Sequence, residues 1–158
     1  MTLPISKSPK ILHKGEGRYV AIGDKSSCTF KVVGEETNGQ FGLFEFAMEP
    51  GAGGAKPHTH HRMTEIFYIL EGEVELLAGD RKVTGRPGTL LLVPPDQVHG
   101  FVNSSTVRSV MLVMFCPADR REGYFEGLAE LTKDGRKPSR EELLDLMRRY
   151  DQEPVDEP

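Results

Sequence analysis

The chain has 158 residues, of which 28% are charged, and its formal net charge is −4 at pH 7. A chain of this length is expected to fold as one domain, residues 1–158, that buries a substantial core. The acidic balance argues against a phosphate-binding surface, and no basic stretch alternates with aromatic residues. We therefore expect no nucleic-acid partner.

Neither a targeting segment nor a membrane helix is visible in the sequence. The N-terminal stretch MTLPISKSPKILHK lacks the apolar run of a signal peptide, and no segment reaches the ~20 apolar residues that cross a bilayer. These features predict a cytoplasmic protein without membrane contacts. Cys28 and Cys116 stand outside any paired cysteine motif, which is typical of two reduced thiols, and one disulfide between them is left open as the alternative.

The first half of the chain has the composition of short antiparallel strands that follow a polar arm ending near Gly17. The runs with this composition are residues 18–22, 28–33 and 41–48. Asn38-Gly39 precedes the third run and is a hairpin turn signal. The glycine-rich segment 50–56 lacks the G-K-[ST] ending of a phosphate cradle, so we interpret it as a flexible loop.

Metal-binding side chains concentrate in the stretch that follows this loop. His58 and His60 are two residues apart, so in an extended strand both imidazoles leave the same face. Glu65 opens the β-branched and aromatic run 65–70, which places a carboxylate at the start of a strand. Two imidazoles and one carboxylate suit a first-row transition metal. His61 would point away from His60, and we interpret it as a solvated loop histidine.

Two spaced motifs give this region a family resemblance. The first motif consists of His58, His60, Glu65 and Gly72, with Gly53 or Gly54 near its leading position. The second motif consists of Gly88, Pro94, His99 and Asn103. Together they resemble the paired motifs of the cupin superfamily, over roughly residues 40–115. Asp96 stands where that family usually has glycine, and aspartate tolerates the left-handed backbone that such a turn needs.

The resemblance implies an all-β fold, the cupin double-stranded β-helix or jelly-roll barrel, over about residues 18–116. It also implies that a divalent transition metal is bound, whether iron, manganese, nickel, cobalt, copper or zinc. The implied ligands are His58, His60, Glu65 and His99. Further runs with strand-like composition, separated by turn residues, agree with a barrel: 73–78, 81–84, 89–93, 98–102 and 106–115.

The periodicity changes after the barrel, which predicts short amphipathic helices in residues 119–150. Asp119 with Glu122, and Ser139 with Glu142, each have the spacing of a helix capping box. The acidic, proline-containing tail 151–158 is predicted to fray.

Among cupins, the chain resembles single-domain bacterial proteins of the quercetinase type. That resemblance implies a metal-dependent dioxygenase acting on a flavonol-like or small enolic or aromatic substrate, with Glu65 as a catalytic base toward a substrate hydroxyl. Phe44, Phe46, Phe67 and Phe101 are expected to supply an apolar wall, and the sequence leaves open which of them point inward.

Two other functions stay open at this point. The first is a non-redox isomerase, cyclase or decarboxylase that uses the ion as a Lewis acid, and the second is a small-molecule binding module without catalysis. The runs 66–70 and 111–115 are apolar on both faces, so something is expected to cover their outer side. We expect a homodimer contact there, with the C-terminal helices as the alternative cover.

Overall fold

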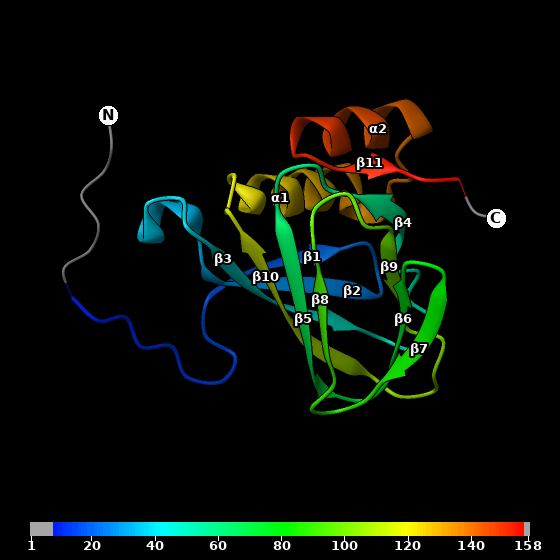
Figure 1. Ribbon diagram of the computed structural model, residues 1–158, viewed down its shortest axis with the longest axis horizontal. Helices are drawn as coiled ribbons and strands as arrows, with labels where there is room; N and C mark the ends of the chain where they lie inside the picture. The colour runs from blue at the N-terminus through cyan, green and yellow to red at the C-terminus, as the bar shows by residue number, and fades with distance from the viewer. Residues whose placement is uncertain (1–7, 157–158) are drawn as a thin grey trace.

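Residues 8–156 are described by the computed structural model, and they form two antiparallel sheets that face each other (Figure 1). The six-stranded sheet has the order β1 (Arg18–Ile22), β2 (Ser26–Val32), β3 (Gly42–Met48), β10 (Ser109–Cys116), β5 (Thr64–Glu71) and β8 (Leu90–Val93). The five-stranded sheet has the order β11 (Glu153–Pro154), β4 (Ala55–Thr59), β9 (His99–Val102), β6 (Val74–Ala78) and β7 (Arg81–Gly85). The expected all-β jelly-roll architecture is confirmed.

The first three strands form the expected antiparallel meander, β1 with β2 and β2 with β3. Their connection differs from the prediction in one detail. Asn38 and Gly39 both have positive φ, but they follow a short 3-10 helix, η1 (Gly34–Thr37), and do not form a two-residue hairpin loop. Asn38 caps that helix through its backbone N–H to the carbonyl of Gly34, so the left-handed residues end a helical turn.

Alternation along the strands turns phenylalanines into the space between the sheets. In β3, Phe44 and Phe46 are buried, whereas Leu43 and Glu45 on the other face are only half-buried. Helix α1 (Arg121–Leu131) closes this core, because the ring of Phe125 lies 5.0 Å from that of Phe44 and 6.2 Å from that of Phe46. The helices therefore pack at one end of the barrel and not on its outer face, so the alternative cover for that face is wrong (Figure 1).

One of the two predicted capping boxes is present. In α2 (Arg140–Arg149), Ser139 Oγ accepts a hydrogen bond from Glu142 N at 3.2 Å, and Glu142 accepts one from Ser139 N at 2.7 Å. The Asp119 box before α1 is wrong, because Arg120 occupies the cap position without a side-chain bond. The Asp119 carboxylate instead accepts from Arg62 Nη2 at 2.5 Å, a partner that no local pattern reveals.

The two helices pack closely against each other through glycine. Leu146 of α2 is buried against Gly127 of α1, where an added Cβ would approach Leu146 Cδ1 to 2.4 Å. A short 3-10 turn, η2 (Lys133–Gly135), connects the helices. The apolar face predicted for the second helix is therefore a packing face.

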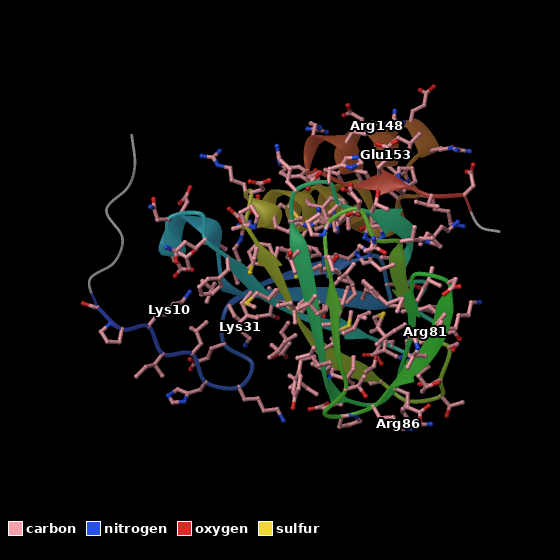
Figure 2. All side chains as sticks on the ribbon, in the orientation of Figure 1. Lys10, Lys31, Arg81, Arg86, Arg148 and Glu153 are labelled. Atoms are coloured by element: carbon pink, nitrogen blue, oxygen red, sulfur yellow. The ribbon has the colours of Figure 1, made fainter. Side chains whose placement is uncertain are left out.

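The C-terminal tail does not fray over its described part, contrary to the prediction. Residues 153–154 form β11, which pairs with β4, and Val155 N donates to Pro57 O at 3.0 Å. Figure 2 shows Arg148 and Glu153 side by side, and their side chains form an ion pair of 3.2 Å. Residues 157–158 of the predicted tail lie outside the described residues. The acidic composition did not indicate an ordered tail, because the hydrogen bonds that pair the tail with β4 are made by its backbone.

The N-terminal segment 8–17 has no helix or strand, as expected for an arm. It still contacts the barrel, because Lys10 Nζ donates to the carbonyl of Lys31 at 2.8 Å (Figure 2). Residues 1–7 of the predicted arm lie outside the described part. Cys28 and Cys116 are free, as the sequence predicted. No helix in residues 8–156 is long and apolar enough to span a bilayer.

Candidate metal site

Three histidines converge because two strands of the five-stranded sheet pair at them. His58 in β4 lies opposite His99 at the start of β9, and His60 follows directly after β4 on the same face as His58. All three imidazoles are buried, with at most 2% of each residue exposed. The shared face expected for His58 and His60 is confirmed.

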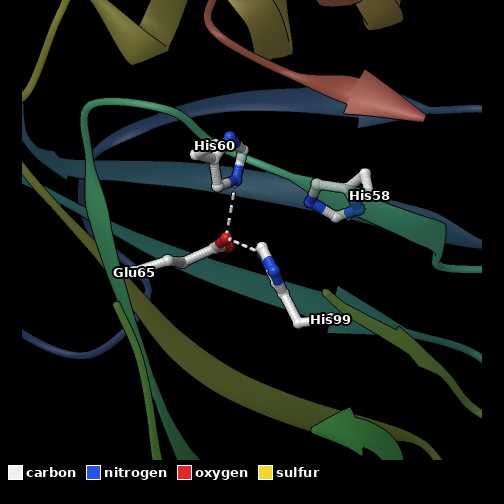
Figure 3. Close-up of side chains that lie close together, drawn as sticks. All are labelled: His58, His60, Glu65 and His99. Atoms are coloured by element: carbon white, nitrogen blue, oxygen red, sulfur yellow. Dashed lines mark hydrogen bonds and ion pairs between the residues drawn. The ribbon is translucent and has the colours of Figure 1, made fainter. Parts of the chain in front are cut away.

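Glu65 reaches the same point from the opposite sheet. It is the second residue of β5, and its Oε2 atom lies 2.8 Å from His60 Nε2 and 2.6 Å from His99 Nε2 (Figure 3). One potential ligand atom from each of His58, His60, Glu65 and His99 lies within 4.8 Å of the others. The structure thus brings together all four side chains that the sequence nominated.

Each imidazole is oriented through its other ring nitrogen. Nδ1 of His58 lies 2.7 Å from the carbonyl oxygen of Lys56, and Nδ1 of His99 lies 3.0 Å from that of Gln97. Nδ1 of His60 lies 2.6 Å from the carbonyl oxygen of Asp151 in the C-terminal tail. A carbonyl only accepts, so in the neutral ring Nδ1 carries the proton and the Nε2 lone pair faces the cluster.

This donor set fits a divalent cation. Three Nε2 lone pairs and a carboxylate oxygen are all acceptors, and acceptors at 2.6–2.8 Å from one another need a proton or a cation between them. Imidazole and carboxylate are common ligands of first-row transition metals. The cluster therefore suggests a metal site, and its ligands do not distinguish among these metals.

The electrostatics of the cluster favour a neutral His58 and an ionised Glu65, whereas His99 is drawn toward its protonated form by the carboxylate. Burial, together with the neighbouring His99, lowers the pKa of His58 to about 3. For Glu65, burial would raise the pKa, but His99 and the hydrogen bonds from His60 and His99 hold it well below its usual value. Burial likewise opposes protonation of His99, yet the Glu65 carboxylate raises the pKa of His99.

A turn in the second motif is hydrogen-bonded to the first motif. Asp96, the residue that replaces the usual glycine, has φ of 66°, as its tolerance of left-handed backbone predicted. Its backbone N–H donates to the carbonyl of His60 at 2.7 Å. Its carboxylate lies 2.8 Å from Nδ1 of His61, whose side chain is 64% exposed. His61 is outside the cluster, which confirms its interpretation as a solvated histidine.

Asn103, the last residue of the second motif, holds the glycine-rich loop. Its buried Nδ2 donates to the carbonyls of Met48 and Val107 at 3.1 and 2.9 Å, and its backbone oxygen accepts from Gly51 N at 2.9 Å. Gly54 has φ of 58° and packs so tightly on Phe101 that a Cβ would lie 2.0 Å from the Phe101 carbonyl oxygen. The loop is therefore anchored at both ends by the barrel.

A cavity of about 710 Å³ opens beside the cluster, between the barrel and the two C-terminal helices. His58 and Glu65 form part of its wall. The remaining wall is mainly apolar and comes from three places: Phe46, Phe101 and Phe115 of the barrel, Tyr124 and Phe125 of α1, and Leu143, Leu144 and Met147 of α2. Of the four phenylalanines expected at this wall, Phe46 and Phe101 line the cavity, whereas Phe44 and Phe67 pack behind it.

Sequence reasoning missed three residues that contact the site. Asp151 supports His60, Gln152 is buried and lines the cavity, and Arg121 lines the cavity with 2% of its surface exposed. The helix pattern identified apolar positions only, and it assigned Gln152 to a fraying tail. A buried arginine carries no local sequence signal, because its burial depends on the tail folding back over α1.

Comparison with known proteins agrees with this geometry. Residues 44–115 match the family model described as Cupin domain. Quercetin 2,3-dioxygenase from Bacillus subtilis (strain 168) is 31% identical over 101 residues, which are 63% of this chain and 29% of that protein. KdgF from Halomonas sp. matches with a TM-score of 0.61 and 19% identity, covering 70% of this chain and 94% of that one. The polyketide cyclase RemF from Streptomyces resistomycificus gives a TM-score of 0.59 and 23% identity, covering 69% and 80%.

The fold, the two motifs and these similarities show that the chain resembles the single-domain cupins. Within that superfamily it resembles the quercetinase type, although it spans only 29% of the length of the Bacillus dioxygenase.

Proposed function

We propose that the protein is a metal-dependent dioxygenase of the quercetinase type that acts on a flavonol-like or small enolic or aromatic substrate. The observation that carries this proposal is the position of Glu65, within hydrogen-bonding distance of His60 and His99 and on the wall of the cavity. The similarity to quercetin 2,3-dioxygenase supports the choice of reaction. The ligands would be His58, His60, Glu65 and His99.

A bound redox-active metal would supply the chemistry toward dioxygen and an electrophilic site for an enolic oxygen. The chain's own residues would do the rest. Glu65, whose pKa is held well below its usual value by His99 and by hydrogen bonds despite burial, is ionised at neutral pH. The ionised carboxylate is the form that can accept the proton of a substrate hydroxyl. Phe46 and Phe101 would hold an aromatic ring and exclude water.

The test is oxygen consumption by the metal-loaded protein over a panel of flavonols and small enols. The parent should consume oxygen with at least one member of the panel, and Glu65→Gln should lose at least roughly a hundredfold in rate while keeping its fold. His61→Gln is the matched control, because His61 is exposed and outside the cluster. Normal turnover by Glu65→Gln would refute the proposed role of Glu65.

Two further measurements with the same panel of compounds separate the two other functions. Product formation that continues without oxygen would indicate a non-redox isomerase, cyclase or decarboxylase, a possibility that the fold shared with the cyclase RemF leaves open. A ligand-induced rise in melting temperature without any product would indicate a binding module.

We also propose that a second copy of the chain covers the outer face of the six-stranded sheet. On this face, strand register aligns one apolar row across β3, β10, β5 and β8, and a second row across the last three of these strands. The rows are Leu43, Met114, Ile66 and Leu92, then Leu112, Tyr68 and Leu90. Leu90 and Leu92, on the edge strand, are 59% and 53% exposed.

Light scattering tests this contact. The parent should have the mass of a dimer, and the double substitution Leu90→Glu and Leu92→Glu should shift it to the mass of a monomer. Val83→Glu is the control, because Val83 is 41% exposed on β7 of the other sheet. A parent that is monomeric at all concentrations would remove the dimer.

A further inference from the structure

Arg121 is a buried cation at the wall of the cavity. It is the first residue of α1, only 2% of its surface is exposed, and it lines the same cavity as His58 and Glu65. Arginine stays protonated in proteins, so this side chain carries its charge into the interior. Burial lowers the pKa of Arg121, as expected for a charged group that is removed from water.

The guanidinium is only partly satisfied. Nη1 donates to the carbonyl of Tyr150 at 2.9 Å, and Nη2 donates to Gln152 Oε1 at 2.5 Å. Nε is buried and has no hydrogen-bond partner among the described residues. Within residues 8–156, no carboxylate forms an ion pair with Arg121. Both of its hydrogen-bond acceptors are neutral, and the Glu65 and Asp151 carboxylates stabilise its charge only from beyond ion-pair distance.

Aromatic rings compensate for the buried charge only in part. The guanidinium carbon lies 4.0 Å from the ring centre of Tyr124 and 4.7 Å from that of Phe115. Such cation–π contacts are favourable, but they are weaker than the cost of removing an ion from water. A neutral side chain could make the two hydrogen bonds to the tail without that cost, so tail anchoring alone does not account for an arginine here.

The wall next to Arg121 offers a second donor. Tyr124 also lines the cavity, and its hydroxyl oxygen accepts a hydrogen bond from Gln152 Nε2 at 3.1 Å. That bond leaves the hydroxyl proton free to donate. Burial raises the pKa of Tyr124, so the hydroxyl stays protonated at neutral pH. One wall of the cavity thus carries metal-binding groups, and the wall from α1 carries a cation and a neutral donor.

We infer that Arg121 is the anion-binding residue of the substrate site, and that the substrate is a small acid whose carboxylate pairs with Arg121 while its enolic or phenolic oxygens face the His58 and Glu65 wall. This assignment rests on the proposed function for the end of the substrate that faces the metal-binding residues. It narrows the substrate class from neutral flavonols to carboxylated enols and hydroxyaromatic acids. Arg121 acts here by binding and selecting the substrate.

Calorimetric titration of the zinc-loaded protein tests the inference without any turnover. The probes are protocatechuate and its primary amide, which share a metal-chelating catechol and differ in charge. The parent should bind the acid roughly 30-fold or more tightly than the amide, since a buried charge pair has this order of effect on affinity. Arg121→Gln should bring the two affinities within about threefold of each other, and Arg121→Lys should keep an intermediate preference.

Arg149→Gln is the matched control, because Arg149 is exposed on α2 and lies outside the cavity wall. It should leave the preference for the acid unchanged. A merely structural role of Arg121 would change melting temperature and zinc content but would not change the ratio of the two affinities. If Arg121→Gln does not fold, the ratio of the acid and amide affinities in the parent and in Arg121→Lys still tests the inference.

Two results would overturn the inference: a parent that binds acid and amide equally, or a preference that survives in Arg121→Gln. Failure of the proposed function has a different signature. A zinc-loaded parent that prefers the acid but whose redox-metal form consumes no oxygen would refute the dioxygenase and keep the Arg121 site. If no metal binds, benzoate and benzamide replace the catechol probes and test Arg121 alone.

Discussion

The three imidazoles of the cluster are held in two different ways. His58 and His99 are each oriented by a carbonyl two residues earlier in the chain, whereas His60 is oriented by Asp151, which lies 91 residues away in the sequence. The barrel therefore sets two of the ligands by itself, and the C-terminal tail must fold back to set the third. The proposed metal site therefore includes the tail as well as the two motifs.

Removing a ligand held by the barrel should have the largest effect. His99→Ala deletes one of the Nε2 atoms that would bind the metal next to Glu65. We therefore expect the dissociation constant for a divalent metal to rise by at least about a hundredfold. Calorimetric titration with zinc or cobalt measures this change. His61→Ala serves as the control and should bind metal like the parent, and equal binding by the two variants would contradict the ligand assignment.

Removing the metal should loosen the tail more than the barrel. Without a metal the His60 ring loses one of its two fixed contacts, so its bond to the Asp151 carbonyl weakens. After treatment with a chelator, hydrogen exchange at the backbone amides of Gln152 and Val155 should accelerate by about tenfold, a shift in opening free energy of about 1.4 kcal/mol. Amides of β6 and β7 should change little. Uniform acceleration would contradict the coupling between the metal and the tail.

Weakening the tail should in turn weaken the metal site, but less than deleting a ligand. The Asp151 carboxylate accepts hydrogen bonds from the backbone N–H groups of His61 and Arg62, both at 2.9 Å. Asp151→Asn retains one acceptor and tolerates the left-handed backbone at this position, where φ is 54°. We expect metal affinity to fall about tenfold. Asp145→Asn, on an exposed turn of α2, is the control; no difference between the two variants would remove the tail from the site.

The smallest expected effect concerns the helix caps on the tail side. Ser139→Ala removes a cap that bonds Glu142 N, so the free energy of unfolding should fall by about 1 kcal/mol. Asp119→Asn suits the left-handed backbone at this position, where φ is 42°, so it removes only the partly exposed ion pair with Arg62 and should cost less than that. Urea denaturation measures both. A larger loss for Asp119→Asn would mean that the ion pair stabilises the entry to α1 more than a helix cap does.

The difference between local and long-range contacts also explains which parts of the site could be predicted from the sequence. Strand geometry related His58 to His60 and placed Glu65 at the start of a strand, and the resemblance to the cupin motifs added His99. Local backbone chemistry likewise predicted the left-handed Asp96.

Long-range partners were invisible to the same reasoning. Asp119 has the spacing of a capping box, but its carboxylate is bound by Arg62, which is 57 residues away. Composition predicted a frayed tail, whereas hydrogen bonds of Asp151 to the barrel and of Gln152 to α1 hold it in place. Arg121 was missed for the same reason, because only the folded tail encloses it.

The most direct test of the metal site is elemental analysis of the parent protein purified without chelators and reconstituted with a single divalent metal. We expect close to one equivalent of tightly bound metal per chain, lost in His99→Ala and retained in His61→Ala. A parent that holds no metal after reconstitution with each of iron, manganese, nickel, cobalt, copper and zinc would show that the cluster is not a metal site.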